Sequence, residues 1–132
     1  MARKRIFISY DHENDARYKN LLHAWNKHND FDLQIYNGSL HIAINSQNAA
    51  YVKSQIRPMI TWCSYLLCLI GEDTHKSAWI DWEINTAVEN DKRLIAVKIT
   101  KDCISPPAIM NRGATWALSF NYEAIKKAID GA

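Results

Sequence analysis

The sequence predicts an α/β domain built on a doubly wound, five-stranded parallel sheet. Short apolar runs rich in β-branched and aromatic residues alternate with longer segments of helical period, a pattern typical of βαβ units. Of the 132 residues, 48% are hydrophobic and 23% are charged, which suits a core of ordinary size and excludes a disordered chain or a coiled coil. We therefore expect one domain that spans residues 1–132.

The N-terminal part predicts a strand, a helix and a second strand. The run RIFISY at residues 5–10 is the first strand, and the polar residues 11–15 form a turn. The carboxylates of this turn are expected to cap the next helix, because they face the positive end of its dipole. Apolar residues that begin at Tyr18 recur at helical spacing and predict an amphipathic helix ending near Asn29. The second strand is expected at residues 32–36.

The middle of the chain predicts a helix with an internal proline, followed by a buried strand. Ser46 is suited to cap the helix, whose apolar residues are spaced to cover one side. Pro58 falls inside this pattern, so the helix is expected to kink or stop near Arg57. The continuous apolar run at residues 65–70 suits a central strand with helices on both faces.

The C-terminal part completes the alternation. Its predicted elements are a helix capped by Ser77 or Thr74, a strand, a long loop, a short strand and a closing helix, at residues 77–90, 94–99, 100–113, 115–119 and 122–129. Short right-handed crossovers favour the strand order 2-1-3-4-5 of the flavodoxin-like layout. A site in such a sheet lies at the carboxyl ends of its strands, so we expect it in the loops at residues 10–15, 37–44 and 71–76.

Composition excludes several classes of partner. The 16 basic and 14 acidic residues are interspersed and leave a net charge of +2, so we expect no nucleic-acid partner. No apolar run reaches the roughly 18–20 residues of a membrane span, and the run after the basic N-terminus is shorter than the roughly 7–15 residues of a signal-peptide core. We therefore expect a cytoplasmic protein with no membrane partner. Neither the cysteines nor the histidines have the spacing of a metal site, so we expect no metal.

One carboxylate interrupts the apolar face of the helix at residues 77–90. At about 100° per residue, Trp79 lies roughly 40° to one side of Glu83 and Ala87 roughly 40° to the other, while Ile84 continues the apolar arc. A carboxylate in such a place is either paired with a neighbouring Arg or Lys or is a functional group whose desolvation is tolerated. The pattern alone leaves both interpretations open.

Two motifs resemble those of a known family. The run RIFISY at residues 5–10 resembles the first-strand signature of TIR and TIR-like domains, and Ser77-x-Trp79-x-x-x-Glu83-Ile84 is similar to their S-x-W-x-x-x-E helix. The chain looks closest to the TIR-like proteins of bacterial Thoeris anti-phage systems. This resemblance implies that Glu83 is the catalytic residue of NAD cleavage, with NAD as a substrate and no cofactor.

The resemblance also implies a biological context. The product would be a signalling nucleotide, either a cyclic ADP-ribose isomer or an ADP-ribose conjugate, which a separate effector protein reads. Assembly of the protein with itself and a phage-derived trigger belong to the same expectation. The enzyme class would be an NAD glycohydrolase or ADP-ribosyl cyclase.

The remaining site residues follow from the sheet-edge rule. Small polar side chains and backbone amides suit ribose and diphosphate oxygens, and we expect such groups opposite Glu83 at Ser9, Tyr10, Asp11, Asn37, Gly38 and Ser39. Trp79, one turn before Glu83, is expected to form an apolar wall for the nicotinamide. A single carboxylate can suffice, because the cationic nicotinamide departs neutral and needs no general acid.

Two alternatives remain open at this point. A nucleoside deoxyribosyltransferase-like enzyme has the same layout and also uses a glutamate at an anomeric carbon. A non-catalytic TIR-type interaction module would have lost turnover. Incubation with NAD or with a deoxynucleoside separates these possibilities.

Overall fold

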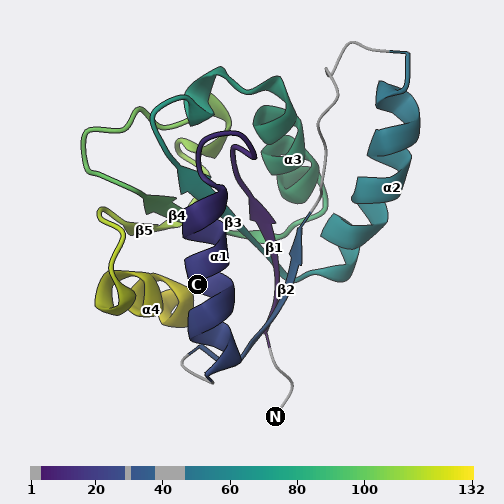
Figure 1. Cartoon of the computed structure of the whole chain (residues 1–132). Coiled ribbons are helices and arrows are strands. Elements are labelled where there is room, and N and C mark those ends of the chain that lie inside the picture. Colours follow the sequence, from purple (N-terminus) through teal and green to yellow (C-terminus); the bar gives the residue numbers. More distant parts are fainter. Residues whose placement is uncertain (1–3, 29–30, 38–46) are drawn as a thin grey trace.

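The computed structural model describes residues 4–28, 31–37 and 47–132. Within them, five parallel strands lie in the order β2-β1-β3-β4-β5, as Figure 1 shows. The strands are β1 (Lys4–Ser9), β2 (Leu33–Asn37), β3 (Tyr65–Ile70), β4 (Arg93–Lys98) and β5 (Thr115–Ala117). The helices are α1 (Ala16–Lys27), α2 (Ala49–Trp62), α3 (Ala78–Glu89) and α4 (Tyr122–Gly131), with short 3-10 turns η1 (Thr74–Lys76) and η2 (Pro107–Ile109). The predicted parallel sheet and its strand order are confirmed.

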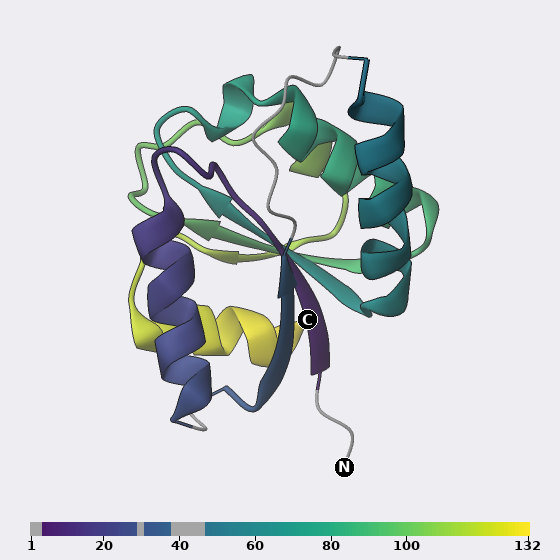
Figure 2. The same ribbon diagram turned by 45° about the vertical axis from the view of Figure 1, so that its right-hand side comes forward.

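Helices cover both faces of the sheet. Figures 1 and 2 show α1 and α4 on one face and α2 and α3 on the other. Successive side chains of β1 alternate between the two cores: Ile8 packs in the cluster under α1 and α4, and Phe7 in the cluster under α2 and α3. The central strand β3 is buried on both faces, as its continuous apolar run predicts.

Of the two outcomes predicted for α2 near its proline, a kink or a stop, the stop is wrong. The helix continues through Pro58 to Trp62. A proline removes one helical hydrogen bond, to the carbonyl of the residue four positions earlier, which is Ser54. Both residues are on the exposed side, where water can satisfy that carbonyl, while Ile56 and Ile60 are buried on the other side and hold the helix against the sheet. Tertiary packing therefore overrides the local preference.

The strand β3 has the predicted bounds, and, apart from the end of α2, the other element boundaries agree with the predicted ones to within two residues. The first strand begins at Lys4 and ends at Ser9, and β5 ends at Ala117 instead of residue 119. The structure places the N-cap of α2 at Asn48, and the predicted cap Ser46 lies outside the described residues. The ends of helices and strands have fewer backbone hydrogen bonds than their middles and fray easily, which limits the accuracy of any boundary predicted from sequence.

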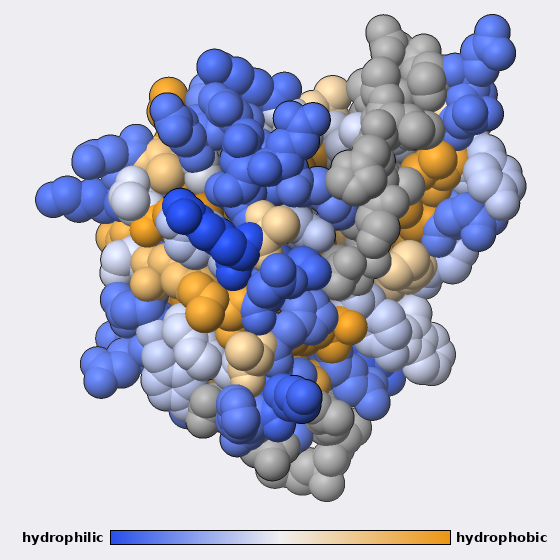
Figure 3. Space-filling view, in the orientation of Figure 1, coloured by the Kyte–Doolittle hydropathy of each residue, from blue (hydrophilic) through white to orange (hydrophobic). Residues whose placement is uncertain are grey.

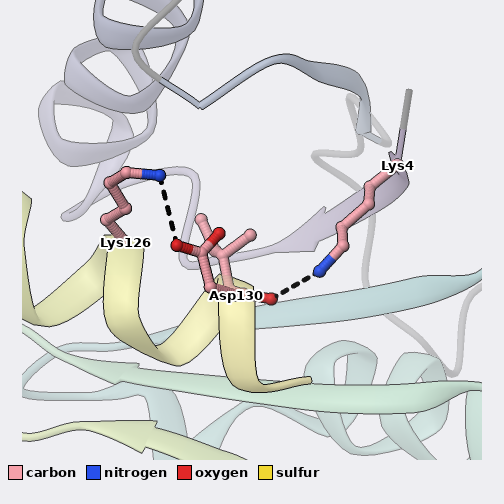
Figure 4. Close-up of polar contacts among 4 residues, drawn as sticks. Lys4, Lys126 and Asp130 are labelled. Carbon is pink, nitrogen blue, oxygen red and sulfur yellow. Dashed lines mark hydrogen bonds and ion pairs between the residues drawn. The ribbon is translucent and has the colours of Figure 1, made fainter. Parts of the chain in front are cut away.

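The closing helix is tied to the first strand. Lys4, at the start of β1, donates a hydrogen bond from its ammonium to the carbonyl of Ile129 at 2.8 Å, in the last turns of α4 (Figure 4). The same carbonyl also accepts a hydrogen bond from the backbone N–H of Ala132 at 3.3 Å, which caps the end of the helix. Lys126 and Asp130 also pair along the helix at 3.2 Å, an exposed contact that contributes little to stability.

The described surface exposes several large apolar side chains. The face seen in Figure 3 is mainly hydrophilic, with apolar patches divided by polar side chains. The large hydrophobic residues that are exposed in the described part of the chain come from α1, from α2 and from the C-terminal loops, namely Leu21, Tyr51, Trp62, Ile104, Met110 and Leu118. Within residues 4–28, 31–37 and 47–132, no helix has the length and apolarity that a membrane crossing requires.

Candidate active site

The candidate site is centred on Glu83, which α3 directs toward the end of β1. Ser77 caps this helix, since its side-chain oxygen accepts a hydrogen bond from the backbone N–H of Ile80 at 3.2 Å, as predicted. Glu83 is only 7% exposed and Ser9, the last residue of β1, is 1% exposed. The Ser9 hydroxyl donates to Oε1 of Glu83 at 2.7 Å. The fold thus brings together two residues that are 74 positions apart in the sequence.

Burial dominates the electrostatics of this pair. It raises the pKa of Glu83 from 4.5 to about 8, against the smaller lowering effect of the hydrogen bond from Ser9. No basic side chain of the described residues forms an ion pair with Glu83. Of the two interpretations left open by the sequence, the structural ion pair is therefore not formed within this part of the chain.

Trp79 lies in the first turn of α3. Its indole is half-buried and packs edge-to-face on Trp82, with ring centroids 5.8 Å apart. The ring of Trp82 is in turn covered by Lys53 and Arg57 of α2, whose cationic groups lie 5.6 and 5.4 Å from its centroid. Trp79 therefore takes part in helix packing, and its role as a wall for a ligand stays a prediction.

Tyr10 and Asp11 are positioned differently from Ser9. Tyr10 is buried in the apolar cluster under α1, its ring stacked on His12 with centroids 4.2 Å apart. Its pKa is raised by burial and, secondarily, by the charge of Glu83. The Asp11 carboxylate accepts hydrogen bonds from the backbone N–H of Glu13 at 3.0 Å and the side-chain amide of Asn14 at 2.8 Å, so it shapes the turn after β1. The structure thus brings Ser9, but not the ring of Tyr10, directly against Glu83.

Three of the predicted site residues follow β2. Asn37 ends this strand, paired in register with Ile8 of β1. Its side chain, together with Gly38 and Ser39, lies outside the described residues. Their predicted role beside Glu83 is therefore untested.

Asp15 forms a second buried contact, which the sequence analysis missed. It occupies the N-cap of α1, yet its carboxylate makes no capping hydrogen bond, so the predicted side-chain cap is wrong here. The side chain turns instead toward Gly71, where an added Cβ atom would overlap Oδ2 of Asp15, and toward the Thr74 hydroxyl at 3.5 Å. Burial, and then the charge of Asp11, raise the pKa of Asp15 to about 6. A side chain at position 71 would displace this carboxylate from its place.

A cavity of about 540 Å³ opens at the same edge of the sheet. Its lining comes from the first turn of α1 and the loops after β1, β3 and β4, and it includes Asp15, Tyr18, Gly71 and Cys103. Neither Ser9 nor Glu83 lines it. The loop after β4 was not among the predicted site loops. In the described part of the chain, no three His, Cys, Asp or Glu side chains are grouped so that they could hold a metal ion.

Comparison with known proteins supports one family. The family model described as Thoeris protein ThsB, TIR-like domain, matches residues 7–103. No curated protein matches the chain at a significant level.

Several solved structures share the fold. A 2-deoxyribosyltransferase from Bacillus psychrosaccharolyticus covers 92% of this chain and 90% of its own, with 15% identity and a TM-score of 0.63. A 2-desoxiribosyltransferase from Leishmania mexicana covers 72% of this chain and 64% of its own, with 18% identity and a TM-score of 0.55. A 3-dehydroquinate dehydratase-like protein from Bifidobacterium longum covers 98% and 94%, with 15% identity and a TM-score of 0.50. At such identities the likeness shows the fold alone.

Proposed function

The chain belongs to the TIR-like domain family of the Thoeris protein ThsB, and we propose that it cleaves the nicotinamide–ribose bond of NAD in anti-phage defence. The observation that carries this proposal is the buried pair of Glu83 and Ser9 on the motif helix and the first strand. NAD is the substrate, and no further cofactor is invoked.

The chemistry requires one anion beside the reacting ribose. When the bond between the anomeric carbon and the nicotinamide nitrogen breaks, its electron pair returns to the ring, which leaves neutral. Positive charge then develops on the ribose, and a carboxylate in a dry environment stabilises it more strongly than it would in water. Ionised Glu83 fills this role, and the hydrogen bond from Ser9 fixes the direction in which its oxygens point.

A nucleophile then captures the ribosyl cation and loses a proton to solvent. Water would give ADP-ribose, a nitrogen of the adenine or a hydroxyl of the distal ribose would give a cyclic isomer, and a separate acceptor would give a conjugate. We propose that the product is a cyclic isomer or a conjugate that activates a separate effector protein. In this proposal the protein acts in the cytoplasm, assembles with itself and responds to a phage-derived trigger.

The other proposed contacts surround Glu83. Trp79, one helical turn away, would cover the nicotinamide. Polar groups of Tyr10, Asp11, Asn37, Gly38 and Ser39 would bind ribose and diphosphate oxygens. For Tyr10 this role would fall to the backbone, because its ring is packed under α1.

Chromatography of nucleotides tests the proposal. Wild-type protein is incubated with NAD, alone and in lysates of phage-infected cells that express it, and nicotinamide and ADP-ribose derivatives are quantified. Glu83→Gln should abolish nicotinamide release. Glu89→Gln, which changes an exposed acid on the same helix, is the matched control and should leave it unchanged. Absence of nicotinamide release by folded wild-type protein under both conditions would refute catalysis and favour the interaction module.

A second candidate function has one observation in its favour. The fold is shared with proteins described as 2-deoxyribosyltransferases. A carboxylate at an anomeric carbon would serve deoxyribosyl transfer between bases as well as NAD cleavage. Parallel incubation with a deoxynucleoside and a second free base decides between them, because base exchange without nicotinamide release would favour the transferase.

A further inference from the structure

Glu83 faces no compensating charge in the described part of the chain. From β1, the neutral hydroxyl of Ser9 contacts it, and Tyr10 is near enough for the charge of Glu83 to raise its pKa. From β3, the pKa of the buried Cys68 thiol is also raised, first by burial and then by the charge of Glu83. The cations of α2 nearest to α3 lie over the ring of Trp82. Among the described residues, the hydrogen-bond partner of the carboxyl group is neutral, and the other charges that act on Cys68 beside it are the acids Asp15 and Asp81. Within this part of the chain, an ionised Glu83 would therefore be a buried charge without an opposite charge.

The protonation state of such a carboxyl group depends on whether a cation lies beside it. In the free protein, burial without a cation favours the neutral acid. A positively charged ring placed against the carboxyl group would supply the missing opposite charge and favour the carboxylate.

We propose that Glu83 is neutral in the free protein and is ionised by the cationic nicotinamide of the incoming NAD, so that the site selects the oxidised dinucleotide over the reduced one. The inference rests on the proposed function and adds to it a criterion of substrate choice. The balance is simple: the carboxyl O–H bond of Glu83 breaks, its electron pair stays on oxygen, and the proton passes to solvent. The reduced dinucleotide has the same shape and diphosphate charge, but its dihydronicotinamide ring is neutral and cannot drive this step.

The linkage gives measurable quantities. With a pKa of about 8 in the free protein and a fall of about two units beside a cation, roughly 0.8 proton leaves per ligand bound at pH 7. The same fall makes the affinity for a cationic ligand rise about 25-fold between pH 6 and pH 8, because only the ionised form binds it well. Affinity for a neutral-ring ligand should change less than about twofold over this range.

Isothermal titration calorimetry with two probes tests the inference. The first probe is an uncleavable NAD analogue in which a cyclopentane ring replaces the nicotinamide-bearing ribose, so that the nicotinamide stays cationic. The second probe is NADH. Binding heats measured at pH 7 in phosphate and in Tris, which differ in ionisation enthalpy, give the number of protons released, and titrations at pH 6, 7 and 8 give the affinity profile.

Two variants separate ionisation from general loss of binding. Glu83→Gln should bind both probes without proton release and with a flat pH profile. Glu89→Gln, an exposed acid on the same helix, should behave as wild type. A carbon-13 titration of the Glu83 carboxyl in free wild-type protein measures its ionisation independently of any ligand.

The outcomes distinguish this inference from the proposed function. Proton release and a rising profile with the cationic probe, and neither with NADH, support it. Nicotinamide release from NAD by a protein that binds both probes with flat profiles would overturn the inference and leave the proposed function standing. Failure to bind the cationic probe would overturn both. A Glu83 carboxyl that titrates at its ordinary value in the free protein would overturn the inference by itself.

Discussion

The substitution Glu83→Gln should stabilise the folded protein above pH 5 while it abolishes NAD cleavage. The pKa of Glu83 is about 8 in the folded state and about 4.5 in the unfolded chain, so the folded state holds this proton more tightly. The unfolding free energy of the wild type therefore falls as pH rises from the unfolded value toward the folded one. Between pH 5 and pH 7.5, the contribution of Glu83 amounts to a loss of about 3 kcal/mol.

Glutamine is nearly isosteric and neutral at every pH, so the variant lacks this loss. Its side-chain carbonyl can still accept the hydrogen bond from Ser9. About one unit below pH 4.5 and lower, where the wild-type acid is also largely neutral in both states, we expect the two proteins to differ by less than about 1.5 kcal/mol. The advantage of the variant should then grow by about 3 kcal/mol between pH 5 and pH 7.5.

Urea unfolding of both proteins at pH 5, 6 and 7.5, followed by tryptophan fluorescence and circular dichroism, measures this difference. Other titrating groups, such as Asp15, are common to the two proteins and cancel in the comparison. If Glu83 were instead held by an ion pair, its replacement would cost about 3–5 kcal/mol. A variant that is less stable than wild type at pH 7.5, or a difference that does not vary with pH, would refute the argument.

Three further predictions concern the surroundings of the site. Trp79→Phe should change the free energy of unfolding by less than about 1.5 kcal/mol, as apolar substitutions of similar volume do. It should nevertheless lower NAD turnover or alter the product ratio measured by chromatography. Unchanged turnover and products would show that Trp79 serves packing alone. Gly71→Ala should destabilise the fold by about 1–3 kcal/mol in urea titrations, because its Cβ meets the carboxylate of Asp15. In a double-mutant cycle, Asp15→Ala should recover part of that loss. Additive effects of the two substitutions would contradict the contact. Of the three thiols, only Cys103 should react with a thiol reagent in native protein at pH 8. Cys63 and Cys68 are buried, and burial raises the pKa of Cys63 to about 11. Rapid labelling of a second thiol before unfolding would contradict the packing described.

The fold was predictable because period and burial agree along most of the chain. Residues 65–70 form a continuous apolar run, which is typical of a strand with helices on both faces of its sheet. The structure buries β3 on both faces. The error at Pro58 has the opposite origin. A local preference of one residue was taken as decisive, although the buried isoleucines on either side of it outweigh the loss of one solvent-facing hydrogen bond.

The site was predictable in part. The motif glutamate and the sheet-edge rule together placed Glu83 opposite Ser9, and these two residues are in contact. The contact between Asp15 and Gly71 could not be read from the sequence, because a glycine after a strand is also the ordinary residue of a loop. The cavity beside the loop after β4 was missed because the predicted loops came from strands one to three alone.

The cost of Glu83 is itself an argument about its role. Its neighbours on the buried side of α3 are Ile80, Ile84 and Ala87, and any apolar residue at position 83 would extend this face without a desolvation penalty. A loss of about 3 kcal/mol is a substantial share of the roughly 5–15 kcal/mol that stabilises a domain of this size. A residue selected for stability alone would not be an acid whose hydrogen-bond partner among the described residues is a hydroxyl. An uncompensated carboxyl group is, however, what a site for a cationic leaving group requires, because the ligand brings the opposite charge with it.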